Sequence, residues 1–265
     1  MSLGLSMGGR LTPARLVAHC LLVEGDQGLT LVDTGFGTAD IAQKRMGKGF
    51  IRLTGLALDP ADTAVAQVRA AGYDAADVTD VVLTHLDLDH AGGLGDFPGA
   101  RVHVFGDELA AATARATLPE KNRYLAAQWA HGPRWIEHAV AGEGWLGFEA
   151  VKVLSDDVLL IPLQGHTRGH CGVAVRRPSG GWFLHAGDTY FFHGEKDTPP
   201  TCPPGLSLFQ RLVQMDKSAR VANADRVRSL HAEHGPDSGA SADETVTVFC
   251  AHDAVEFDAL ADVTD

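Results

Sequence analysis

Short apolar, β-branched runs recur along this chain, and histidine or aspartate follows four of them within a few residues. The runs cover residues 78–83, 158–163, 182–184 and 245–249. Runs of this length, bounded by glycine and polar residues, predict buried strands. Polar side chains that follow a strand lie where a rigid scaffold presents functional loops. The pattern therefore predicts one site assembled from several strand ends.

The remaining pattern predicts strands alternating with helices. Residues 21–32 predict a hairpin with a turn at Asp26-Gln27-Gly28, and residues 101–105 alternate like a strand. Residues 63–71 predict a helix that stops at Gly72, and the alanine-rich stretch 107–116 predicts another. This mixture indicates the α/β class. No low-complexity linker interrupts the chain, so we expect one domain over residues 1–265.

The densest chemistry lies in the hexapeptide HLDLDH at residues 85–90. Its histidines and aspartates are His85, Asp87, Asp89 and His90, and Ala91-Gly92-Gly93 follow at once. Imidazole nitrogens and carboxylate oxygens suit zinc, iron or manganese. A solvated acidic loop with two incidental histidines is the alternative. Further ligand candidates elsewhere in the chain favour the metal site.

Those candidates follow the three later strands. They are GHTRGH at 165–170, HAGDT at 185–189 and CAHD at 250–253. One such segment would be weak evidence, whereas four in this order predict a shared metal site.

The order HxDxDH, GHTxGH, GDT and a late His-Asp pair resembles the metallo-β-lactamase-fold hydrolases. The early LVDTG at residues 31–35 resembles the first motif of that superfamily, and the likeness spans nearly the whole chain. Among its branches, the lactonase and related esterase-type members are most similar. The resemblance implies a four-layer αββα sandwich.

The resemblance also implies a site for two divalent metal ions, most simply zinc. His85, Asp87 and His170 would bind the first ion, and Asp89, His90 and His252 the second, with Asp188 bridging them. Only four of the thirteen histidines are then ligands. His166 would have a structural role, orienting the loop that presents His170.

Asp87 departs from the commonest family pattern, which has histidine there. Aspartate as a ligand would make a harder, more anionic first site that tolerates iron or manganese, as in the flavodiiron proteins. The alternative is a weakened first site. The other ligand positions are intact, which favours Asp87 as a ligand.

Such a site predicts hydrolysis of an ester, lactone or similar small molecule. A water between two cations is acidified and attacks the substrate carbon. Asp89 would orient this nucleophile or move its proton, and Tyr190 would donate to the oxyanion or leaving group, although a core position is the alternative for Tyr190. A non-haem di-iron oxidoreductase and a scaffold with a defective site are the other hypotheses. Against the oxidoreductase, the 265 residues leave no room for a flavin-binding domain. Against the scaffold, none of the expected ligand residues is lost.

Composition narrows the class of partner. The formal net charge is −12, and no Lys/Arg cluster is present that could follow a phosphate backbone, which argues against nucleic acid. No apolar stretch is long enough to span a membrane. The N-terminal stretch lacks a signal-peptide pattern and the four cysteines form no CxxC pair, so we expect reduced thiols in a cytoplasmic protein.

Two segments outside the motifs are expected to shape the pocket, near residues 119–148 and 191–230. The first contains three of the four tryptophans, and the second holds a proline-rich stretch followed by an amphipathic segment at 206–230. The aromatic side chains would line an apolar pocket, pack on the core, or contact a second subunit in a homodimer. The sequence leaves these alternatives open.

Overall fold

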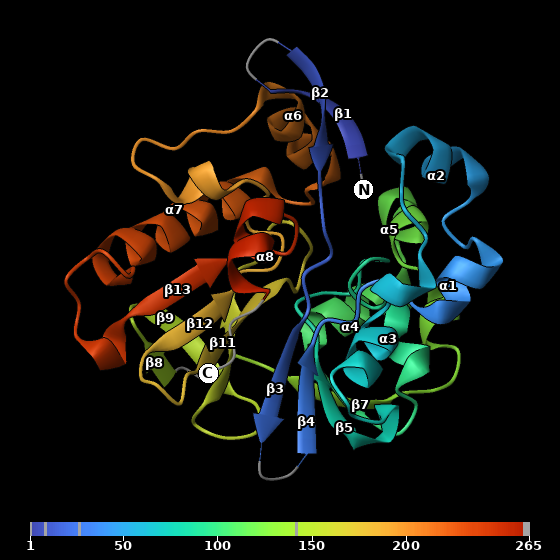
Figure 1. Cartoon of the computed structure of the whole chain (residues 1–265), viewed down its shortest axis with the longest axis horizontal. Helices are drawn as coiled ribbons and strands as arrows, with labels where there is room; N and C mark the ends of the chain where they lie inside the picture. The colour runs from blue at the N-terminus through green and yellow to red at the C-terminus, as the bar shows by residue number, and fades with distance from the viewer. Residues whose placement is uncertain (1, 8–9, 26–27, 141–142, 262–265) are drawn as a thin grey trace. The chain divides into compact units, whose positions relative to one another are not determined.

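The computed structural model describes residues 2–7, 10–25, 28–140 and 143–261 (Figure 1). Contacts between Cα atoms divide the chain into two compact units. The N-terminal unit consists mainly of residues 18–138, and the C-terminal unit of residues 3–17 and 139–265. Each unit is described by itself below. The expectation of a single domain stays a prediction.

The N-terminal unit contains a five-stranded sheet in the order β3-β4-β5-β6-β7. The strands are β3 (Leu21–Gly25), β4 (Gly28–Val32), β5 (Val78–Val82), β6 (Arg101–Phe105) and β7 (Arg134–His138). β3 and β4 pair antiparallel, and the other neighbours pair parallel. The predicted hairpin and the strands at 78–83 and 101–105 are confirmed, whereas the turn residues 26–27 lie outside the described residues.

α-Helices lie in the connections between β4 and β5 and between β6 and β7 of this unit. They are α1 (Thr38–Gln43), α2 (Lys48–Thr54), α3 (Ala64–Ala70), α4 (Gly106–Ala114) and α5 (Leu118–Arg123). The predicted helix at 63–71 is α3, which Thr63 caps by accepting a hydrogen bond from the backbone N–H of Ala66 at 3.4 Å. Val65 and Val68 lie on its buried face. The helix predicted at 107–116 is α4.

The C-terminal unit contains a six-stranded sheet in the order β13-β12-β11-β10-β9-β8. The strands are β8 (Glu143–Trp145), β9 (Phe148–Lys152), β10 (Val158–Pro162), β11 (Cys171–Arg176), β12 (Trp182–His185) and β13 (Val246–Phe249). Neighbours pair antiparallel except for β12 and β13, which are parallel. The three strands predicted before the later motifs are therefore confirmed. A further two-stranded hairpin consists of β1 (Ser2–Met7) and β2 (Arg10–Arg15).

The segment at 206–230, expected to be amphipathic, lies within two helices. They are α6 (Pro204–Val213) and α7 (Lys217–His234), and α8 (Ala254–Leu260) follows β13. The helical conformation is interrupted at residues 214–216, where Asp216 caps α7 by accepting from the backbone N–H of Ala219 at 2.9 Å. The N–H groups of Met215 and Asp216 donate to the carbonyl of Gly165, at 3.0 and 2.9 Å. The residues between the two helices thus hold the loop in which the GHTRGH motif begins.

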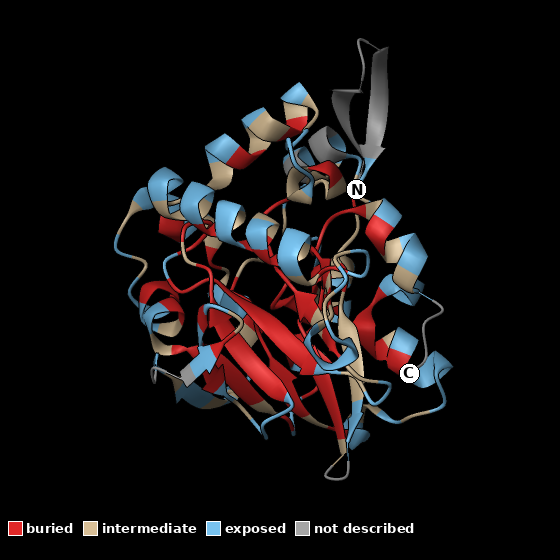
Figure 2. Ribbon diagram, turned by 90° about the vertical axis from the view of Figure 1, so that its left-hand side faces the viewer, coloured by how far each residue is buried: buried red, intermediate tan, exposed pale blue. Residues whose placement is uncertain are grey.

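Each unit has its own apolar core, and the central strands of each sheet are largely buried (Figure 2). Aromatic side chains of the 119–148 segment are part of one or the other of these cores, or pack against it. Tyr124 is buried in the N-terminal core and Trp129 and Trp135 pack against it, whereas Trp145 is buried in the C-terminal core. These contacts are the ones expected if the aromatic side chains pack on the core. Both units combine strands with helices, so the predicted α/β class is confirmed.

Candidate metal centre

The hexapeptide lies in the loop that follows β5, as the apolar run predicted. The imidazoles of His85 and His90 are buried, and their ring centroids are 3.9 Å apart. The loop thus brings two candidate ligands of the N-terminal unit together.

Asp33, in the LVDTG motif, orients both imidazoles. Its carboxylate accepts from Nδ1 of His90 at 2.8 Å and from the backbone N–H and hydroxyl of Thr84 at 2.8 and 2.7 Å. The Thr84 hydroxyl gives its one hydrogen to Asp33, so it accepts from Nδ1 of His85 at 3.0 Å. With both Nδ1 atoms protonated, the Nε2 atoms of the neutral imidazoles carry lone pairs suited to a metal.

Two buried side chains hold the backbone of the same loop. Glu108 accepts from the N–H of Leu86 at 3.0 Å. Gln128 donates to the carbonyl of Leu88 at 2.8 Å and to Asp40 at 2.7 Å. Burial raises the pKa of Asp40, which the Gln128 hydrogen bond opposes. Neither support could be identified from the sequence, because the positions of Glu108 and Gln128 in the chain carry no ligand-like pattern.

The glycines after the hexapeptide are required by close packing. A Cβ on Gly92 would lie 2.4 Å from Oδ2 of Asp40, and one on Gly93 would lie 2.6 Å from the carbonyl oxygen of Thr34. Both distances are shorter than van der Waals contact, so the Gly92-Gly93 pair allows the loop to pack on the chain after β4.

Asp87 faces one of these imidazoles and also a cation. Its Oδ2 atom lies 3.4 Å from Nε2 of His85 and 3.4 Å from Nη1 of Arg123. In the neutral imidazole of His85, Nδ1 carries the hydrogen, so Nε2 and the carboxylate are two electron-pair donors that face each other. A cation between them would make that arrangement favourable. Arg123 was not identified from the sequence.

Asp89 is the more exposed carboxylate of the hexapeptide. Its side chain is 19% exposed, and its Oδ1 atom lies 4.0 Å from Nε2 of His90. The catalytic and metal-binding roles of Asp89 stay predictions.

In the C-terminal unit, candidate ligands gather around Asp188, in the loop after β12. Nε2 of His252 lies 3.1 Å from this carboxylate, and Nε2 of His166 lies 3.2 Å from its Oδ2 atom. Nδ1 of His252 donates to the carbonyl of Val17 at 2.7 Å, so in the neutral imidazole the Nε2 lone pair faces the carboxylate. This donor set also fits a divalent cation.

The contacts reverse the roles expected for the two histidines of GHTRGH. His170 was expected as the ligand, but its Nδ1 atom donates to the carbonyl of Leu163 at 2.8 Å and its Nε2 atom accepts from the N–H of Asp188 at 2.8 Å. A lone pair that accepts an N–H does not bind a metal at the same time. His166, expected to be structural, instead faces the Asp188 carboxylate. Two histidines four residues apart look equivalent in the sequence, and only backbone direction distinguishes them.

That direction depends on Gly165, which has φ = +134°. A Cβ there would lie 2.2 Å from the backbone nitrogen of Arg220. The loop before His166 therefore needs glycine for its conformation and for its close contact with α7.

The structure also corrects the catalytic role expected for Tyr190. This side chain is buried in the C-terminal core, and its hydroxyl donates to the buried Glu256 carboxylate, 2.9 and 3.1 Å from the two oxygens. Burial, followed by the charge of Glu256, raises the pKa of Tyr190 well above its ordinary value. Lys196 pairs with the same carboxylate at 2.5 Å. Tyr190 therefore belongs to a buried network with Glu256 and Lys196, as expected for the alternative of a core position.

His103, expected as a strand residue, lies on β6 in a buried polar cluster. Its Nε2 atom donates to Asp80 at 2.9 Å, and its Nδ1 atom lies 3.0 Å from Nε2 of His138. Arg101 donates twice to the same carboxylate, at 2.7 and 2.8 Å. The cluster contains none of the expected ligands.

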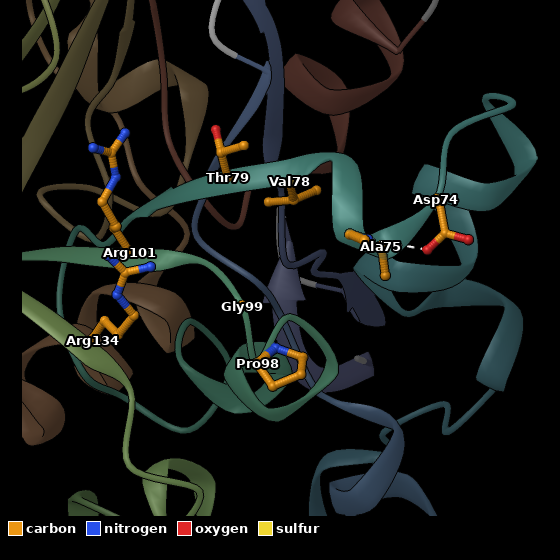
Figure 3. A pocket seen from close by; sticks show the side chains of 9 residues that line it. Asp74, Ala75, Val78, Thr79, Pro98, Gly99, Arg101 and Arg134 are labelled. Atoms are coloured by element: carbon orange, nitrogen blue, oxygen red, sulfur yellow. Dashed lines mark hydrogen bonds between the residues drawn. The ribbon is translucent and has the colours of Figure 1, made fainter.

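A cavity of about 570 Å³ opens at the amino ends of the parallel strands in the N-terminal unit (Figure 3). Val78, Arg101 and Arg134, the first residues of β5, β6 and β7, line it. The hexapeptide follows the carboxyl end of β5, so this cavity lies at the opposite edge of the sheet. In Figure 3, Asp74 lies beside Ala75, on the opposite side of the view from Arg101 and Arg134, and its carboxylate accepts from the backbone N–H of Ala76 at 3.1 Å.

No helix among the described residues combines the length and the apolar character needed to cross a bilayer. The longest described helix, α7, is rich in charged and polar side chains.

Comparison with known proteins places these motifs in one family. The model of the metallo-beta-lactamase superfamily matches residues 14–244. A probable metallo-hydrolase of Mycobacterium tuberculosis is 39% identical over 241 residues, 90% of this chain and 75% of that protein. An N-acyl homoserine lactonase of Bacillus thuringiensis is 31% identical over 115 residues, 42% of this chain and 46% of that protein.

Solved structures show the same fold. An N-acyl homoserine lactone hydrolase, with the product N-hexanoyl-L-homoserine bound at its catalytic metal centre, superimposes with a TM-score of 0.68. It is 20% identical, and the match covers 94% of this chain and 87% of that one. The fold expected from the motifs is thereby confirmed. The chain belongs to the metallo-beta-lactamase superfamily.

Proposed function

We propose that the protein is a metal-dependent hydrolase acting on a small ester or lactone. One observation carries the proposal. In both units, an imidazole with its Nδ1 hydrogen donated elsewhere directs Nε2 at a carboxylate, at 3.4 Å for His85 and Asp87 and at 3.1 Å for His252 and Asp188. Electron-pair donors arranged in this way fit a cation.

The proposed ligands are the histidines and carboxylates that face one another within each unit. They are His85, Asp87, Asp89 and His90 in the N-terminal unit and His166, Asp188 and His252 in the C-terminal unit. His170 is replaced by His166 because both ring nitrogens of His170 bond to backbone groups. The dinuclear assignment with Asp188 as the bridge rests on the family resemblance.

Two divalent ions, with zinc as the first expectation, would supply a water of lowered pKa and polarise the substrate oxygen. The protein's own part is to hold the ligand tautomers. Asp33 and the Val17 carbonyl keep the Nδ1 atoms of His90 and His252 protonated. Asp89, more exposed than its neighbours, is proposed to accept the proton of the attacking water.

The substrate class is supported by the names of the relatives. N-acyl homoserine lactonases are similar to this chain in sequence over 42% of its length, and in fold over most of it. A lactone and an ester share the carbonyl carbon that a hydroxide attacks. The di-iron oxidoreductase alternative rested on the extra negative charge of Asp87, and Arg123 beside that carboxylate weakens it.

The test is metal analysis of protein purified without chelators, with hydrolysis assays on an N-acyl homoserine lactone and a simple aryl ester. We expect bound zinc or manganese, hydrolysis of at least one substrate, and loss of activity on chelation that added metal restores. Asp188→Asn should lose metal and activity, whereas His131→Ala, a change at an exposed histidine, should lose neither. Metal-free protein that stays inactive with added zinc, manganese or iron would refute the proposal. Bound iron with dioxygen consumption would favour the oxidoreductase.

A further inference from the structure

Arg123 places a permanent positive charge beside a proposed metal ligand. Its Nη1 atom lies 3.4 Å from Oδ2 of Asp87, and the two side chains are only 11% and 14% exposed. The same Oδ2 atom lies 3.4 Å from Nε2 of His85. The oxygen that could share a cation with His85 is therefore the one that faces the guanidinium.

The position of Arg123 is fixed by its surroundings. Arg123 is the last residue of α5, and the next residue, Tyr124, is buried and donates to Glu108 at 3.1 Å. The same Glu108 oxygen accepts from the N–H of Leu86 at 3.0 Å, one residue before Asp87. One buried carboxylate thus ties the end of α5 to the ligand loop, so the backbone of Arg123 is held within reach of Asp87.

The charge of this pair explains why an aspartate can stand where the family pattern has a neutral histidine. A carboxylate alone would add one negative charge to the first metal site. Arginine keeps its charge at every physiological pH, so Arg123 offsets that charge. The Asp87–Arg123 pair is together as neutral as the imidazole it replaces.

We propose that Arg123 determines metal selectivity at the His85–Asp87 position, by neutralising Asp87. The inference rests on the proposed function. Hard cations such as Mn²⁺ depend on anionic oxygen ligands, whereas Zn²⁺ also binds well to neutral imidazole. Neutralising the carboxylate therefore weakens Mn²⁺ binding more than Zn²⁺ binding. Arg123 keeps a carboxylate-containing site selective for zinc.

The first experiment removes the charge and keeps the stem. Arg123→Met should bind Mn²⁺ at least about tenfold more tightly than the wild type, with a smaller gain for Zn²⁺, measured by competition with a chelator of known affinity. Arg123→Lys, the matched control, retains the charge and should stay close to the wild type. Unchanged Mn²⁺ affinity in Arg123→Met, or an equal gain for both ions, would overturn the inference. If Arg123→Met fails to fold, Arg123→Gln is the second charge-free variant.

The second experiment exchanges the pair for the common family residue. Asp87→His leaves the guanidinium without its carboxylate, next to a bound cation, so zinc affinity should fall by about tenfold or more. Asp87→His with Arg123→Met should recover that affinity. Full zinc affinity in Asp87→His alone, or no recovery in the double variant, would contradict the neutralising role.

These outcomes separate the inference from the proposed function. Wild-type protein that binds neither zinc nor manganese refutes both. Wild-type protein that binds metal and hydrolyses its substrate, with Arg123→Met equal to it in Mn²⁺ and Zn²⁺ affinity, refutes only the role of Arg123. The circular dichroism and melting temperature of each metal-free variant show whether a loss of affinity reflects unfolding.

Discussion

The two units orient their candidate ligands by different means. In the N-terminal unit, side chains fix the imidazole tautomers, because Asp33 and Thr84 contact the Nδ1 atoms of His90 and His85. In the C-terminal unit, a backbone carbonyl takes this role for His252, since Val17 accepts from its Nδ1 atom. A side-chain support can be removed by one substitution. A carbonyl support is present whatever residue supplies it, so the two units should respond differently to mutation.

The largest expected effect breaks the side-chain support. Asp33→Ala removes the acceptor of His90 and of both Thr84 hydrogen bonds, leaving buried polar groups unpaired. The free energy of unfolding of the metal-free protein should fall by about 3–5 kcal/mol, measured by urea titration. Metal affinity should fall by about 100-fold.

Asp33→Asn is the control for this change. Asparagine tolerates the positive φ of 55° at this position and still offers an oxygen to the Thr84 N–H. It should lose less stability than the alanine variant. Equal losses in the two variants would mean that the backbone conformation, and not the carboxylate, supports the ligands.

The next effect separates the two histidines of the C-terminal unit. His170→Ala leaves the Leu163 carbonyl and the Asp188 N–H without their partner and should cost about 2–3 kcal/mol of stability. His166→Ala should cost less stability but lower the metal content. Urea titration and metal analysis of both variants measure this. Loss of metal in His170→Ala, with full metal in His166→Ala, would restore the original assignment.

A smaller effect tests the buried tyrosine of the same unit. Tyr190→Phe removes one hydrogen bond to Glu256, which keeps its contacts with Lys196 and the N–H of Cys250. The expected loss of stability is about 1 kcal/mol, with kcat/KM unchanged. A fall in kcat of about 100-fold at unchanged stability, the size typical of a lost oxyanion donor, would return a catalytic role to Tyr190.

The smallest effect concerns His103 and His138, which contact other side chains and are not among the proposed metal ligands. Burial lowers the pKa of His103, against the hydrogen bond to Asp80, and burial together with the charge of His103 lowers that of His138. The unfolded chain, with a histidine pKa of about 6.5, then binds more protons than the folded protein as the pH falls. Stability should therefore be complete above that pH and fall, by about 1 kcal/mol, as the pH drops through it.

Urea titrations of metal-free protein at about pH 7.5 and pH 5.5 measure this loss. His138→Gln, which removes the half-buried member of the pair, should show a smaller loss between the two pH values. Other histidines contribute equally to both proteins, so the difference isolates this pair. An unchanged loss in the variant would assign the pH dependence to the other histidines.

Much of the fold and of the ligand inventory could be predicted from apolar periodicity and motif order. The strands before each motif, the hairpin β3–β4 and the helices α3 and α4 follow from local pattern and caps. The wrong assignments share one cause. His166 and His170 have the same local pattern, and so would Tyr190 in a core or in a pocket. Hydrogen bonds to groups far away in the chain distinguish the alternatives in both cases.

Short-range pattern and residue type were enough to predict the α/β class, the family and the loops that carry the candidate ligands. Only the folded chain shows which acceptors the Nδ1 atoms of His85, His90 and His252 meet, which histidine of GHTRGH faces Asp188, and that Arg123 lies beside Asp87. Each of these depends on groups far apart in the chain. Val17 and His252 are separated by 235 residues. Such contacts exist only once the backbone has folded, so no local pattern records them.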